Sequence, residues 1–296
     1  MIEPVKLPYY RDPASLPSAL PTATEIENAT ATLPSNRDPR YNGRIVIVRE
    51  YVVKVGTRVM ENEGNVLLFI EQHLSIPAPR LQAMYRSNGK LHIVMQLMPG
   101  NDLRTLWPKL SEDDKASVTR QLRQMVDEMR SLSSPGFFGS TSRGPLLHRF
   151  FLSPDNDPRI TGPFDTEKNL NAALALRSHQ NWAYNDRRGW ISEFFDRNLA
   201  HSLRNHPSTF THSDLHPQNV LVNEATTGGG KDQKELIVSA IVDWETAGWY
   251  PSYWEYAACF VDFQWCDDWP EKFEAAVNSY PLEAAMLKII RQDLDF

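Results

Sequence analysis

The chain has 296 residues, of which 41% are hydrophobic, so it is long enough and apolar enough to bury a sizeable core. Its formal net charge of −6 argues against a nucleic-acid-binding protein, because such proteins carry a basic face. The two cysteines, Cys259 and Cys266, support neither a disulfide framework nor a four-cysteine zinc site.

Two runs rich in β-branched residues predict neighbouring strands in the N-terminal third. They cover residues 45–49 and 51–55, and Gly56 ends the second run. Lys54 therefore lies near the end of a strand. Before it the chain has only Asn42-Gly43 and no glycine-rich loop that could cover a phosphate. We expect residues 1–40 to form an extension that packs on this part.

An amphipathic helix is predicted for about residues 61–75, because Leu67, Ile70 and Leu74 recur at helical spacing. Glu63 lies on the same face as these apolar residues. A buried carboxylate needs a partner, and Lys54 is the natural one, with Glu71 as an alternative acid for the lysine. Glu63 could instead be an ordinary first-turn glutamate that favours the helix dipole.

The middle of the chain predicts a hairpin followed by helices. Strands at 81–86 and 90–97 flank an Asn-Gly turn, and Pro99-Gly100 stops the second strand. A long helix at 112–132 begins with Ser111, and Asp114 completes a capping box. Residues 137–163 predict a long ordered loop or a substrate-side insertion. Helices are expected at about 166–177 and 190–203.

The most informative segment is Thr211-His212-Ser213-Asp214-Leu215-His216-Pro217-Gln218-Asn219. A buried strand at 220–222, a glycine-rich loop at 225–232 and a second strand at 237–242 follow it, and Asp243-Trp244-Glu245 comes next. If the second strand returns beside the first, Asp214, Asn219 and Asp243 lie together at the same end of the two strands. Phosphoryl transfer needs such a set: a carboxylate that deprotonates the acceptor hydroxyl, and oxygen ligands that hold Mg²⁺.

Two simpler interpretations also fit parts of this segment. His212, Asp214 and His216 alternate with a spacing that could ligate zinc. Alternatively, Asp214 and Asn219 could be turn residues around Pro217. Neither interpretation needs the aspartate after the second strand. We expect His212 to brace the loop rather than take part in chemistry.

The segment resembles the catalytic loop of the aminoglycoside phosphotransferase and choline kinase-like families, small-molecule relatives of the protein kinases. Their usual pattern, His-Gly-Asp-Leu-His-Pro-x-Asn followed by Asp-Trp-Glu, matches here except that Ser213 replaces the glycine. Serine fits unless the backbone there needs a positive φ. The stretch at 247–256 also resembles the family, so the matching motifs cover about 45 residues.

The resemblance implies an α+β, bilobal protein-kinase-like fold, with a small β-rich N-terminal lobe at 1–97 and a larger, mainly helical lobe at 98–296. It implies ATP and Mg²⁺ as cofactors, Asp214 as the catalytic base, and Asn219 and Asp243 as metal ligands. Lys54 would contact the nucleotide phosphates and Glu63 would position it. Residues 96–100 would form the hinge between the lobes, where the backbone of Gln96 and Met98 could bind the adenine edge. An ordinary strand-to-helix turn is the alternative.

The expected function is transfer of the γ-phosphate to a hydroxyl of a small molecule. Aromatic residues and carboxylates at 250–269 could recognise an amine, although core packing explains the aromatic residues as well. A nucleotide-binding pseudokinase that serves as a scaffold is the alternative from another class. A protein kinase fits less well, because the Asp-Phe-Gly and Ala-Pro-Glu segments are missing. We expect a cytoplasmic protein without a membrane partner, because no apolar run approaches the roughly 18 residues that cross a bilayer.

Overall fold

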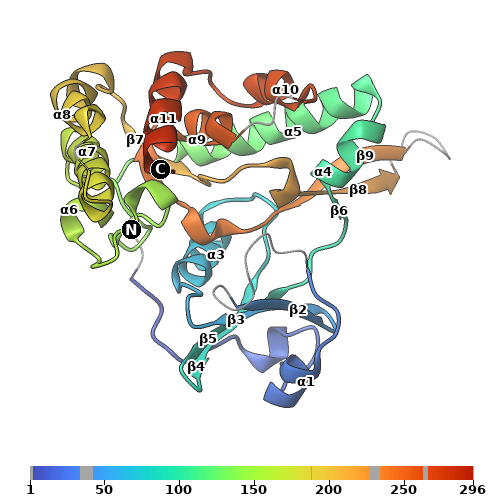
Figure 1. The fold of residues 1–296 in the computed structure, drawn as a ribbon. Helices are drawn as coiled ribbons and strands as arrows, with labels where there is room; N and C mark the ends of the chain where they lie inside the picture. The colour runs from blue at the N-terminus through green and yellow to red at the C-terminus, as the bar shows by residue number, and fades with distance from the viewer. Residues whose placement is uncertain (1–2, 34–42, 188, 227–233, 263–265, 296) are drawn as a thin grey trace.

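The computed structural model describes residues 3–33, 43–187, 189–226, 234–262 and 266–295. A sheet-rich part lies below a larger helical part in Figure 1, which confirms the predicted mixture of helices and strands. The five strands of the main sheet are antiparallel, in the order β1-β4-β5-β3-β2. They are β1 (Tyr9–Tyr10), β2 (Arg44–Val48), β3 (Tyr51–Gly56), β4 (Leu81–Ser87) and β5 (Lys90–Gln96).

Strand β3 carries the predicted lysine into the middle of the sheet. Lys54 is paired with Ile45 on β2 and with Ile93 on β5. The β-branched residues of β2 and β3 are mostly buried, as expected for strands with both faces covered. On one face, residues of the N-terminal segment pack against the sheet through Ile26 of α1 (Ala23–Asn28).

The helix α3 (Asn62–His73) covers the other face of the sheet and joins it to the rest of the molecule. It begins and ends within two residues of the predicted helix. Its buried side includes Val66, Leu67 and Ile70, and Glu63 on the same side is only 2% exposed. The helical periodicity therefore identified the buried face correctly, including its one carboxylate.

The C-terminal part is built around α5 (Glu112–Ser131), whose predicted capping box between Ser111 and Asp114 is present. Val118, Leu122 and Met129, which recur at helical spacing along α5, are buried, whereas Met125 is only partly buried. The remaining helices are α4 (Leu103–Leu106), α6 (Pro158–Thr161), α7 (Glu167–Tyr184), α8 (Trp190–Ser202), α9 (Trp254–Asp262), α10 (Trp269–Ala276) and α11 (Pro281–Leu294).

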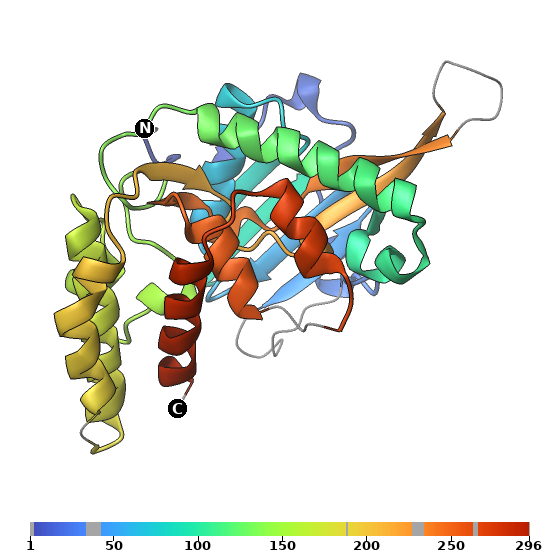
Figure 2. The ribbon, with the colours of Figure 1, turned by 90° about the horizontal axis from the view of Figure 1, so that it is seen from above.

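Helices α7 and α8 form a pair at the side of the molecule, next to α11 (Figure 2). A buried polar contact joins the three helices, because Ser178 of α7 donates a hydrogen bond to Asp293 of α11 and also contacts Ser192 of α8. The predicted ordered loop at 137–163 contains two short helical turns and is pinned by a bridge between Gly139 and Trp249.

Two small sheets carry the segments with the catalytic motifs. β7 (Ser208–Thr211) pairs with β10 (Gly248–Pro251), and β8 (Val220–Thr226) lies between β6 (Asn101–Asp102) and β9 (Lys234–Ile241). The predicted return of the second strand is confirmed, since Val220 is paired with Ile241. Residues 227–233 of the predicted glycine-rich loop lie outside the described residues. In the part of the chain that the structure describes, no helix is both long and apolar enough to cross a membrane.

Candidate active site

A buried lysine surrounded by carboxylates occupies the junction between the main sheet and the C-terminal part. Lys54 Nζ lies 2.8 Å from Glu63 Oε2, 2.5 Å from Asp243 Oδ1 and 3.9 Å from Glu245 Oε2. Burial alone would lower the pKa of Lys54, but the three carboxylates outweigh it and raise the pKa. The predicted pairing of Lys54 with Glu63 is present in the structure.

Helix α3 is tied to the segment that follows Asp243. Asn62 Nδ2 donates hydrogen bonds to the carbonyl oxygens of Glu245 (2.8 Å) and Ala247 (3.0 Å). This link fixes the neighbouring Glu63 against the lysine. Glu63 is desolvated, and burial raises its pKa against the opposing effect of Lys54.

Asp214 and Asn219 meet as the curled loop between them predicts. Asn219 Nδ2 donates to Asp214 Oδ2 at 2.9 Å and to the Asp214 carbonyl oxygen at 2.8 Å. The Val242 N–H donates to the Asn219 carbonyl oxygen at 2.9 Å, so the loop lies against the residue that precedes Asp243. Burial and the nearby charge of Asp243 raise the pKa of Asp214 to about 7. The structure thus brings Asp214, Asn219 and Asp243 to one place.

Glu255 of α9 holds the backbone of the loop that carries Asp214. Its two carboxylate oxygens accept the backbone N–H groups of His212 (2.8 Å) and Ser213 (3.1 Å). Our sequence reasoning placed Glu255 among the acids of a possible amine site and missed this role. A signal was available, since Glu255 lies in an apolar helical stretch where an acid must have a buried partner.

Ser213 adopts a left-handed backbone conformation, with φ of 74°. This is the case in which the glycine of the resembled pattern would be at an advantage. The serine gains a contact in exchange, because Trp254 Nε1 donates to Ser213 Oγ at 3.1 Å. Serine is therefore accommodated at a strained position by a buried side-chain hydrogen bond.

The geometry does not support the zinc interpretation of His212, Asp214 and His216. His212 Nε2 donates to the Val242 carbonyl oxygen (3.0 Å), and Nδ1 accepts the Asp214 N–H (3.2 Å), so both ring nitrogens are engaged. Burial lowers the pKa of His212 to about 4. The imidazole is a neutral brace of the loop.

The oxygen donors nearby fit a magnesium ion. Glu63, Asp243 and Glu245 each offer a carboxylate oxygen within 4.8 Å of the others. Lys54 lies among them and pairs with Glu63, so Asp243 and Glu245 are the acids that could serve a metal, and oxygen ligands are what Mg²⁺ prefers. Because the Asn219 amide nitrogen serves Asp214, its Oδ1 is the atom that would face a metal. Asp243 and Asn219 could hold the ion, as predicted, and Glu245 is an additional acid that the sequence reasoning gave no role.

The predicted hinge follows β5. The Gln96 N–H donates to the Arg80 carbonyl oxygen at 3.0 Å, which ties the end of β5 to the residue before β4. Within the described residues, the backbone of Met98 makes no hydrogen bond. The Pro99 carbonyl oxygen accepts Ser239 Oγ at 2.6 Å, which anchors the segment to β9.

Most aromatic residues of the proposed amine site belong to the core. Tyr253, Trp254 and Tyr256 are buried, and Phe263 and Trp265 lie outside the described residues. Of the acids, Asp262 is the one on the side of Asp214, where His216 Nε2 lies 3.4 Å from Asp214 Oδ1 and 3.9 Å from Asp262 Oδ2. The structure thus favours core packing for these aromatic rings.

Comparison with known proteins assigns the family. The profile of the phosphotransferase enzyme family, APH, matches residues 35–288. The chain belongs to this family. The resemblance seen in the catalytic-loop motifs is thereby confirmed across most of the chain. No curated protein matches the chain.

Solved structures of aminoglycoside phosphotransferases share the fold. The gentamicin complex of APH(2")-IIa has 16% sequence identity and a TM-score of 0.58, and the match covers 93% of this chain and 88% of that one. ADP-bound APH(2'')-Ib has 15% identity and a TM-score of 0.55, with 90% and 79% covered. These matches confirm the predicted bilobal, protein-kinase-like fold.

Proposed function

We propose that this member of the phosphotransferase family transfers the γ-phosphate of ATP to a hydroxyl of a small molecule, with Mg²⁺. The proposal rests on one observation: two sets of residues from distant parts of the chain lie close together. Lys54 and Glu63 come from the main sheet and its helix, and Asp214, Asn219 and Asp243 come from the C-terminal part. They are the lysine, carboxylates and amide that phosphoryl transfer needs.

Asp214 would act as the base. Its pKa of about 7 means that, near neutral pH, the carboxylate can accept the proton of the acceptor hydroxyl. The acceptor oxygen then forms a bond to the γ-phosphorus, the bond from that phosphorus to the bridging oxygen breaks, and ADP leaves. The Asn219 amide holds Asp214 Oδ2 in place during this step.

Lys54 would bind the nucleotide phosphates with an ammonium group that Glu63 keeps in position. Mg²⁺, when bound, neutralises phosphate charge, and we propose Asn219 and Asp243 as its ligands. We also propose that the carbonyl of Gln96 and the backbone of Met98 bind the adenine edge, and that the lobes divide between residues 97 and 98. A cytoplasmic location remains a prediction.

The acceptor would lie on the side of Asp214 where His216 and Asp262 are found. An amine on the acceptor would have to use Asp262, and Asp262 already pairs with Arg149, whose Nη2 lies 2.5 Å from its Oδ2. We therefore expect Asp262 to bind an ammonium group only if Arg149 is displaced. Comparing hydroxyl compounds with ammonium, neutral and anionic substituents would reveal the preference.

The decisive experiment is ADP release from ATP and Mg²⁺ with a panel of amines, sugars and alcohols, for the wild-type protein and for Asp214→Asn. We expect acceptor-dependent turnover that falls by about 10²- to 10⁴-fold in the variant, while the melting temperature still rises with Mg²⁺-ATP. Asp113→Asn is the control, because Asp113 is an exposed acid in the first turn of α5 whose side chain makes no hydrogen bond or ion pair within the described residues. Undiminished transfer by Asp214→Asn would disprove the assignment of the base. Nucleotide binding without transfer to any acceptor would favour a pseudokinase.

A further inference from the structure

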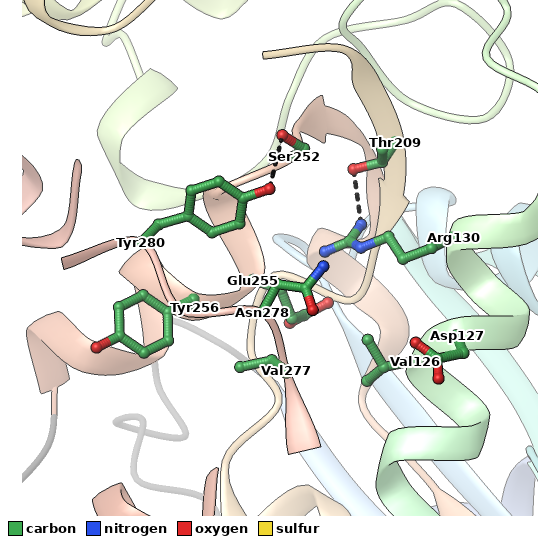
Figure 3. A pocket seen from close by; sticks show the side chains of 10 residues that line it. All are labelled: Val126, Asp127, Arg130, Thr209, Ser252, Glu255, Tyr256, Val277, Asn278 and Tyr280. Carbon is green, nitrogen blue, oxygen red and sulfur yellow. Dashed lines mark hydrogen bonds between the residues drawn. The ribbon is translucent and has the colours of Figure 1, made fainter. Parts of the chain in front are cut away.

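A cavity lies between α5, α9 and the segment that joins α10 to α11, and Thr209 of β7 also lines it (Figure 3). Its volume is about 170 Å³. Lys54, Asp214, Asn219 and Asp243 do not line it. Pockets for drug-sized ligands are larger, typically about 300–1,000 Å³. The size therefore fits a small ion or molecule rather than a nucleotide or an aminoglycoside.

Arg130 is the positively charged residue that lines this cavity, and only one nitrogen of its guanidinium makes hydrogen bonds within the described residues. Nη1 donates to Thr209 Oγ1 (2.7 Å), the Phe210 carbonyl oxygen (2.6 Å) and Thr211 Oγ1 (2.8 Å). Within the described residues, Nε and Nη2 have no hydrogen-bond partner, and no carboxylate lies within 4.0 Å. The partly buried guanidinium therefore has donors left for a ligand, and burial strengthens its attraction for an anion.

The burial of the Arg130 guanidinium affects its pKa. Burial lowers the pKa of Arg130, and the charge of Glu255 opposes this only in part. The residue as a whole is nevertheless only half-buried and lines the cavity. The free donors are thus accessible to whatever fills the cavity.

The two carboxylates that line the cavity are already engaged elsewhere. Both oxygens of Glu255 accept backbone N–H groups of the catalytic loop. Asp127 pairs with Arg123, whose Nε lies 3.0 Å from Asp127 Oδ2. Neutral donors complete the wall: Figure 3 shows Tyr280 bonded to Ser252, with the Asn278 amide nearby. In the described part of the chain the Asn278 side chain makes no hydrogen bond.

We propose that this cavity is a binding site for a small oxyanion, held by Arg130 Nε and Nη2 and by the Asn278 amide. A planar guanidinium presents two parallel N–H donors to two oxygens of a carboxylate, sulfate or phosphate group. The volume accommodates a single such group. The site is separate from the proposed transfer of phosphate and does not depend on it.

An anion here would act on the catalytic loop through two contacts that already exist. Arg130 grips β7, the strand that leads directly into His212, and Glu255 lines the cavity while holding the His212 and Ser213 N–H groups. A bound anion would fix the Arg130 side chain and, through its hydrogen bonds, the strand β7. We expect slower hydrogen exchange at the His212 and Ser213 amides when the site is filled.

The test uses selenate, an oxyanion that can be located by its anomalous scattering, on crystals of the intact protein. We expect a peak within hydrogen-bonding distance of Arg130 Nε or Nη2. In solution, low millimolar sulfate should raise the melting temperature in a saturable way, compared with chloride at equal ionic strength, because sulfate at high concentration stabilises proteins generally.

Asn278→Asp places a carboxylate in the cavity without touching the contacts of Arg130 with β7, so it should fold and lose the saturable shift. Arg130→Gln should lose it too, and Arg120→Gln, an exposed arginine on the same helix, should keep it. A selenate peak at Lys54 with none at Arg130 would overturn the proposal. Equal shifts in the wild-type protein and in Asn278→Asp would do the same.

Discussion

Lys54 Nζ and Asp243 Oδ1 lie 2.5 Å apart, although 189 positions separate the two residues in the sequence. The contact joins the main sheet to the proposed metal-binding segment. A lysine proposed to bind phosphates and an aspartate proposed to bind a metal are thus paired with each other. In the proposed reaction, Mg²⁺-ATP would exchange this ion pair for contacts to the phosphates.

Removing Lys54 should cost both stability and activity. Lys54→Met leaves Glu63 buried without its cation, and breaking a buried ion pair in this way costs about 3–5 kcal/mol. The measurement is urea unfolding without nucleotide. Lys54→Met with Glu63→Leu should recover much of the loss, because an apolar pair can replace a buried ion pair. Turnover should be abolished in both variants. Wild-type stability of the single variant would show that Glu63 does not depend on the lysine.

Glu255 should control the catalytic loop from a distance. Glu255→Gln removes the charge and turns one acceptor into a donor that faces a backbone N–H, so we expect a loss of about 2–3 kcal/mol. The value of kcat should fall more than the affinity for ATP, since the loop carries Asp214. Glu274→Gln is a matched control on α10, where the carboxylate binds only the Tyr256 hydroxyl among the described residues. Equal effects of the two substitutions would refute a special role for Glu255.

Substitutions of Ser213 can separate the cost of backbone strain from the stabilisation by a side-chain hydrogen bond. Ser213→Gly relieves a left-handed backbone, worth about 1–2 kcal/mol, but it loses the hydrogen bond from Trp254, worth about 1 kcal/mol. Its stability should be close to that of the wild type. Ser213→Ala loses the bond and keeps the strain, so it should be the least stable of the three by at least about 1 kcal/mol. Chemical denaturation would rank them, and an alanine variant as stable as the glycine variant would contradict the strain.

Acid should destabilise the fold through His148. Burial holds the pKa of His148 well below 6.5, so above about pH 6.5 the residue is neutral in both the folded and the unfolded state. Below that pH the unfolded chain binds a proton that the folded protein does not. The free energy of unfolding therefore falls by up to about 1.4 kcal/mol per pH unit for this group.

Urea unfolding at pH 8, 6 and 5 would measure this slope. His148→Phe keeps an aromatic ring against Trp254, 5.2 Å away between ring centroids, and removes the titrating group. We expect a shallower slope between pH 6 and 5 in the variant, with the difference at pH 8 as the reference for lost packing. Parallel curves for the two proteins would mean that His148 is protonated in the fold.

The sequence predicted what depends on local pattern. Helical periodicity was enough to place Glu63 on the buried face of α3, and the apolar runs around the catalytic motif were enough to predict that β8 and β9 pair. The boundaries of α3 were predicted to within two residues, whereas β8 runs four residues further and β9 begins three residues earlier than predicted.

What the sequence could not predict depends on backbone conformation or on distant contacts. Asp243 has φ of 64°, and this left-handed turn directs the next residues so that Glu245 approaches Lys54. The pattern of residues around Asp243 does not predict that conformation. The contact of Glu255 with a loop 42 residues earlier follows only from packing, and alternation of acids with aromatic residues pointed instead to ligand recognition.

The two hydrogen bonds of Asn62 have a consequence for regulation. Protein kinases can be silenced by moving the helix that carries the glutamate away from the lysine. Here that helix is fastened by its first residue to the turn after Asp243, the proposed metal ligand. The two hydrogen bonds would have to break, or the turn would have to move, before the helix could swing out. A kinase built in this way would hold its lysine and glutamate together without a separate activation step in this helix.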